Sequence, residues 1–121
     1  MASYRLLETL RGRTHFAMVE AVVASCDVTE APLGHELSEN TPVEWVAAAA
    51  EGLSDAAALS GSSERLIVTK ISGTLVDTRP DTVRVAATLA ALLAVGVATK
   101  ELPLPERRHG CWSLKPIQRA K

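Results

Sequence analysis

Aromatic side chains are scarce in this chain of 121 residues, where they make up 3% of the composition and are limited to Tyr4, Phe16, Trp45 and Trp112. A core without them must consist mainly of Ala, Val and Leu, which lets helices pack closely on a sheet. Base stacking on several rings in a row is the usual way to hold single-stranded nucleic acid. The scarcity of rings therefore argues against an extended aromatic platform.

Cysteine and histidine are also few. His15, His35 and His109 are far apart, form no pair at helical spacing, and have no cysteine at metal-ligand spacing. Neither Cys26 nor Cys111 has a histidine near it in the sequence that could activate the thiol. The sequence also contains no glycine-rich phosphate loop. It therefore predicts no metal and no cofactor, and an enzyme using His35 or a cysteine is the least supported hypothesis.

A hydrophobic run long enough to cross a bilayer is missing as well. The most apolar stretch, residues 83–98, is 16 residues long and contains Arg84, whereas a spanning helix needs about 20 apolar residues. The first residues lead into no sustained apolar core of the kind an export signal has. We therefore expect no membrane contact and a cytoplasmic protein with reduced cysteines.

The remaining composition is that of an ordinary globular domain, with 47% hydrophobic and 22% charged residues. The net charge of −1 is divided unevenly along the chain. Residues 27–64 hold eight acids and no Lys or Arg, while residues 100–121 hold six bases and two acids. This near-neutral total argues against a protein that coats nucleic acid, but the basic C-terminal part leaves a local anionic partner possible. The alternative is that this part is only solvated.

Two helices are predicted from their start signals. Thr41, Pro42 and Glu44 provide a capping hydroxyl, a proline at the first helical position and a carboxylate three residues after the cap. The apolar residues that follow repeat at helical spacing up to Gly61, which predicts the end of the helix. Thr78 and Asp81 repeat the cap spacing, so a second helix is expected from residue 79 or 80 to residue 97.

Strands are predicted on either side of the first helix. Residues 15–26 are apolar at alternate and intervening positions, which favours a strand covered on much of both sides, although their composition also fits a helix. Residues 1–14 suggest a strand or short helix followed by a bend, and residues 27–40 a surface loop. Residues 65–76 form a β-branched strand that Ser72 and Gly73 interrupt, either as a bulge or as a hairpin turn.

The elements together predict an α+β fold, a two-layer sandwich with two helices on one face of a mostly antiparallel sheet of about four strands. Residues 1–98 would form the single domain. Prolines 103, 105 and 116 prevent a continuing helix, so residues 99–121 are expected to form a basic tail packed partly on the domain. We expect Trp112 to be part of that packing, because a lone exposed tryptophan is uncommon.

Three segments resemble domain IV of translation elongation factor G and the ribosomal protection proteins, which has the ribosomal protein S5 domain 2-like fold. Residues 11–20 are similar to the glycine-arginine loop that leads into a strand of that family, residues 42–61 to its Ala- and Glu-rich helix, and residues 73–78 to its tip loop. The chain departs from the family at this tip, because Val76 occupies the position of the family's histidine. No guanine-nucleotide domain is present, so the resemblance implies a fold and possible ribosomal contact but no GTPase activity.

The leading hypothesis is a non-enzymatic module that binds RNA or a ribosomal surface. The predicted contacts are Arg11, Arg13, Arg79, Arg107 and Arg108. The second hypothesis is a protein-interaction or assembly subunit, such as a homodimer that pairs edge strands. Asp77 and Asp81 are interpreted as helix caps, not as a catalytic pair.

Overall fold

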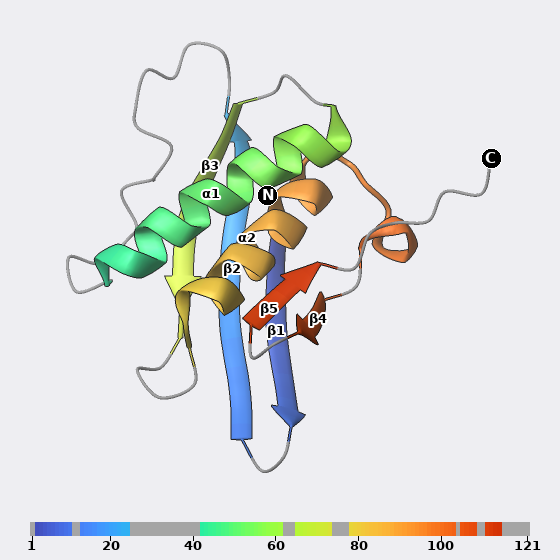
Figure 1. Cartoon of the computed structure of the whole chain (residues 1–121). Coiled ribbons are helices and arrows are strands. Elements are labelled where there is room, and N and C mark those ends of the chain that lie inside the picture. Colours follow the sequence, from blue (N-terminus) through green and yellow to red (C-terminus); the bar gives the residue numbers. More distant parts are fainter. Residues whose placement is uncertain are drawn as a thin grey trace.

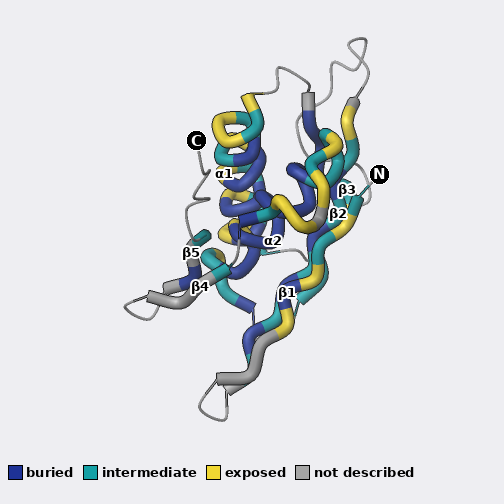
Figure 2. Tube along the Cα trace, turned by 90° about the vertical axis from the view of Figure 1, so that its right-hand side faces the viewer, coloured by how far each residue is buried: buried dark blue, intermediate teal, exposed yellow. Residues whose placement is uncertain are grey.

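The computed structural model describes residues 2–10, 13–24, 42–61, 65–73, 78–103, 105–108 and 111–114. The chain order within these ranges is two strands, helix, strand, helix, and then a short hairpin. Figure 1 shows the two helices lying across a sheet, and Figure 2, turned by 90°, shows both helices on the same side of it. The predicted α+β class, with two helices on one face of an antiparallel sheet, is confirmed.

The sheet consists of β1 (Ala2–Leu10), β2 (Arg13–Ala24) and β3 (Arg65–Ser72), in the order β1-β2-β3. Both neighbouring pairs are antiparallel. The prediction of about four strands was too high for this sheet, because the described chain forms its remaining two strands as a separate hairpin. The predicted strand 65–76 ends at Ser72 within the described residues, and residues 74–77 lie outside them.

Alternation along β2 determines the two faces of the sheet. His15, Ala17, Val19 and Ala21 are buried, whereas the side chains between them are only partly covered. A register shift occurs between Glu20 and Ala21, next to β3. Such a shift adds a residue to one strand of a pair and increases its twist. The buried set faces the helices and forms the sheet side of the core.

Helix α1 (Val43–Ser60) begins one residue later than the sequence predicted. Pro42 has an extended ψ of 138° and its carbonyl accepts the amides of Trp45 and Val46, so Pro42 is the residue before the helix and not its first position. Thr41, the predicted cap, lies outside the described residues. The predicted end is confirmed: Gly61 has a left-handed φ of 67° and donates to the Ala57 carbonyl.

Helix α2 (Pro80–Ala94) begins at the predicted proline but ends before residue 97. The hydroxyl that closes its first turn belongs to Thr82 and not to Thr78. The Arg79 amide donates to Thr82 Oγ1 at 2.9 Å, and this hydroxyl donates to the Arg79 carbonyl at 2.7 Å. Thr78 donates elsewhere, to the carbonyl of Phe16. The spacing rule found the helix start but assigned the wrong threonine.

The two helices approach each other at Gly52. A Cβ at this position would lie 2.6 Å from the Arg84 carbonyl oxygen and 2.7 Å from Ala87 Cβ, so only glycine fits without movement. The buried Thr88 hydroxyl makes short contacts with the carbonyls of Gly52 (3.1 Å) and Arg84 (2.8 Å). The small residues of the sequence therefore allow nearly direct backbone contact between the helices.

An exposed charge network also connects the helices. Arg84 of α2 donates to Asp55 (2.7 Å) and to Glu51 (2.9 Å) of α1. The hydrogen bond to Asp55 is the main cause that raises the pKa of Arg84. Because the three side chains are largely exposed, the network adds only a small stabilisation.

The predicted tail contains a 3-10 helix, η1 (Thr99–Glu101), and an antiparallel hairpin of β4 (Pro105–Arg108) and β5 (Cys111–Leu114). The sequence did not predict this hairpin. It did predict that Trp112 packs on the domain, and Trp112 is indeed 7% exposed and part of the main core.

Candidate nucleic-acid interface

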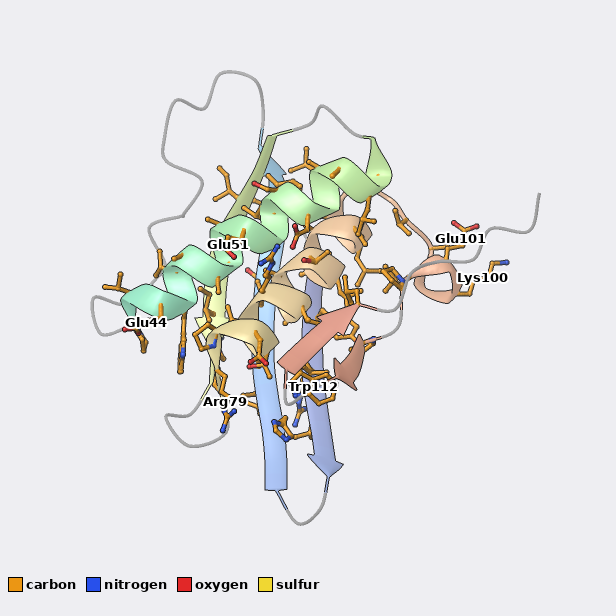
Figure 3. The ribbon with its side chains drawn as sticks, viewed as in Figure 1. Glu44, Glu51, Arg79, Lys100, Glu101 and Trp112 are labelled. Carbon is orange, nitrogen blue, oxygen red and sulfur yellow. The ribbon has the colours of Figure 1, made fainter. Side chains whose placement is uncertain are left out.

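Arg79 lies directly before α2 and its backbone is fixed by the Thr82 hydroxyl on both its amide and its carbonyl. Its side chain is half-buried, and Figure 3 shows it directed away from the body of the fold. In the part of the chain that the structure describes, no carboxylate forms an ion pair with Arg79.

Thr78 connects this segment to the central strand. Its buried hydroxyl donates to the Phe16 carbonyl at 2.6 Å. Because β3 ends opposite Met18, this hydroxyl satisfies a β2 carbonyl beyond the end of β3. A side chain on Gly73 would overlap Thr78, so the glycine permits the close approach. Arg79 is consequently held beside the beginning of β2, where Arg13 pairs with Leu10.

The β4–β5 hairpin is attached to the same region through Trp112. The Trp112 amide donates to Asp81 Oδ2 at 2.7 Å, and Asp81 Oδ1 accepts the Thr82 amide at 2.9 Å. The Trp112 ring meets His15 edge to face, with ring centroids 5.5 Å apart and planes at 64°. One carboxylate and one ring contact thus fasten the hairpin to both α2 and β2.

The position of β4 follows from this attachment. Arg107 pairs with Trp112 across the hairpin, and Arg108 pairs with Cys111. The backbones of Arg13, Arg79, Arg107 and Arg108 therefore lie within a few residues of the contacts that join His15, Trp112 and Asp81. Arg79, the one of these arginines that Figure 3 labels, lies in the lower part of that view. Arg11 lies outside the described residues.

The sequence did not predict that His15 and Asp81 both contact Trp112. His15 was considered only as a metal ligand, and Asp81 only as a helix cap. These contacts join residues that are distant in the sequence, since Asp81 and Trp112 are 31 positions apart. The only available signal was the expectation that Trp112 would pack on the domain.

Among the described residues, the buried Trp112 Nε1 has no hydrogen-bond partner. A buried donor without an acceptor costs about 1–3 kcal/mol. The ring therefore stabilises the hairpin by packing and not by its polar atom.

The residues named for the enzyme hypothesis lie mostly outside the described part of the chain. Cys26, His35, Asp77 and His109 lie outside the described residues. Within the described ranges no group of three or more His, Cys, Asp or Glu side chains could hold a metal ion. In the same ranges no helix is both long and apolar enough to cross a membrane.

Comparison with known proteins adds no assignment. No protein-family model matches the chain, and no curated protein matches it significantly.

Proposed function

We propose that this protein is a small non-enzymatic module that binds RNA, free or on the ribosome, with the end of the fold where α2 begins. The observation that supports this proposal is the convergence of Arg13, Arg79, Arg107 and Arg108 in backbone position toward that end. Arginine is well suited to phosphate because its planar fork can donate two parallel hydrogen bonds. The resemblance to domain IV of elongation factor G, which was noted in the sequence, points to the same class of partner.

Salt dependence of RNA binding tests the proposal. Each phosphate contact contributes about 0.7–0.9 to the slope of log K against log salt concentration. We expect binding of a labelled structured RNA at low ionic strength, measured by fluorescence anisotropy. Arg79→Ala should weaken this binding and lower the slope by about that amount. Lys100→Ala removes the same charge from exposed η1, away from Arg79 in Figure 3, and should have a smaller effect.

A double variant sharpens the test at the β1–β2 turn. Arg11→Ala combined with Arg13→Ala should reduce the affinity for RNA further, because two cations are removed. Absence of binding at low ionic strength contradicts the proposal. Binding that the double variant leaves unchanged also contradicts it.

A second candidate function is assembly with another copy of the chain, and the length of β1 favours it. Among the described strands β1 pairs only with β2, and its nine residues contain no proline or lysine to discourage further pairing. Sedimentation velocity at high protein concentration tests this candidate. A monomer across the concentration range would remove it.

A further inference from the structure

The sheet face opposite the helices carries a surface suited to base stacking. This surface is separate from Arg13, Arg79, Arg107 and Arg108, which were proposed above to contact RNA. Alternation directs Arg5 and Leu7 of β1 and Phe16 and Met18 of β2 toward this face. Arg5 pairs directly with Met18, and Leu7 with Phe16, so these four side chains are neighbours across β1 and β2. None of the described helices lies on this side, as Figure 2 shows.

The apolar part of this face is divided in two. The row Ser3, Glu20 and Lys70 crosses all three strands between the Leu7–Phe16–Met18 group and the Val22–Ile67 pair. A protein partner prefers a continuous apolar patch of several hundred square ångströms. The interruption therefore favours a small flat ligand on the first group over a large protein partner.

Phe16 and Arg5 provide an aromatic ring and a guanidinium group at the first of these two apolar groups. The Arg5 guanidinium carbon lies 5.7 Å from the centroid of the Phe16 ring, within the range of a cation–π contact. The Arg5 side chain is exposed and Leu7 is 50% exposed. Guanidinium planes and aromatic rings are the two protein surfaces on which unpaired bases stack.

The charges on this face complement a phosphate backbone. Arg5 and Lys70 are both exposed cations. The acidic side chain of Glu20 is half-buried and its Oε1 accepts a hydrogen bond from Thr69 Oγ1 at 2.8 Å. This bond holds the carboxylate in place without removing its charge, so the two cations outnumber the one acid among the described side chains of this face. Arg79 lies at the margin of this face, because the Phe16 carbonyl accepts the hydroxyl of Thr78, the residue directly before Arg79. Position 13 is three residues from Phe16 on β2 and so belongs to the opposite face of the sheet.

We propose that the Phe16–Arg5 pair takes an unpaired nucleobase of single-stranded RNA, whose phosphates reach Lys70 on one side and Arg79 on the other. This inference depends on the proposed RNA function and specifies its ligand as a single strand. The scarcity of aromatic residues is compatible with it, because one ring and one guanidinium serve one or two bases, not a long track.

Phe16→Leu tests the inference, because leucine keeps an apolar side chain and removes the ring. The stacking of one base is worth about 1–3 kcal/mol, so the affinity for a short labelled oligouridylate should fall about 5- to 160-fold. The slope of log K against log salt should remain that of the wild type, because no cation is lost. Phe16→Tyr keeps the ring and should bind within about twofold of the wild type. Met18→Leu, an apolar change on the same face, is the matched control.

The outcomes separate the two proposals. If the wild-type protein binds no RNA at low ionic strength, the RNA function and the stacking inference both fail. If the wild type binds and Phe16→Leu binds equally tightly, the stacking inference alone fails. Equal affinity for a duplex and for the oligouridylate would also overturn it. So would a Phe16→Leu variant that changes only self-association in sedimentation. Far-UV circular dichroism confirms that each variant is folded.

Discussion

Gly52→Ala should destabilise the protein, although alanine normally favours a helix more than glycine does. In an exposed helix the change would contribute about 1 kcal/mol of stability. Here the new Cβ would lie 2.6 Å from a backbone oxygen of α2 and 2.7 Å from Ala87 Cβ, whereas ordinary contact begins near 3.4 Å. Neither atom belongs to a flexible side chain, so the helices must separate by nearly 1 Å.

The cost of that separation outweighs the gain in helix propensity. Inserting a carbon into a well-packed core costs about 1–3 kcal/mol, and contact with backbone puts this site at the upper end. The net loss is therefore about 2 kcal/mol. At about 2.1 cal/mol/K per residue the entropy of unfolding is about 0.25 kcal/mol/K for 121 residues, so the melting temperature should fall by about 8 °C.

Thermal unfolding followed by circular dichroism measures this effect. Ser54→Ala, at an exposed position of the same helix, is the control and should be neutral or slightly stabilising. A Gly52→Ala protein that melts at or above the wild-type temperature would refute the close contact between the helices.

Four further substitutions, at three positions, test other parts of the fold. Gly61→Ala should lower the free energy of unfolding, measured in urea, by about 1 kcal/mol. The new Cβ would meet no atom, but alanine is strained at the φ of 67° found there. An unchanged urea midpoint would argue against the left-handed cap. Asp81→Ala should cost about 1–2 kcal/mol by removing the acceptor of the Trp112 amide, and protease cleavage within β4–β5 should become faster; unchanged stability and cleavage would contradict this attachment. Trp112→Phe should change stability by less than about 1 kcal/mol, since the lost Nε1 donor has no partner. Trp112→Ala should cost about 3–5 kcal/mol, and equal losses in the two Trp112 variants would show that Nε1 is satisfied in solution.

Local signals predicted the elements well. Gly61 ends α1 because a left-handed cap is a property of a few neighbouring residues. Pro80 begins α2 for the same kind of local reason. The error at Thr78 has a different origin, because its hydroxyl binds Phe16, 62 residues away in the sequence. A cap rule that considers only near neighbours cannot detect such a competing acceptor.

The candidate site was only partly predictable. The arginines were identified from charge, but their convergence depends on the Asp81–Trp112 hydrogen bond and on the His15–Trp112 ring contact. Both contacts join β5 to elements formed much earlier in the chain. The β4–β5 hairpin was missed because its strands have four residues each and include Pro105, which gives no alternating pattern.

The contact between α1 and α2 also determines how mutational data on this protein should be interpreted. Alanine scanning detects packing by removing side-chain atoms, but the buried alanines of the two helices have none beyond Cβ to remove: Ala48, Ala49 and Ala56 of α1, and Ala86 and Ala87 of α2. Such a scan would report the most closely packed region of the molecule as unimportant. A scan that replaces these positions with valine or leucine would identify the interface, and tolerated positions in it would show where the helices have room to move.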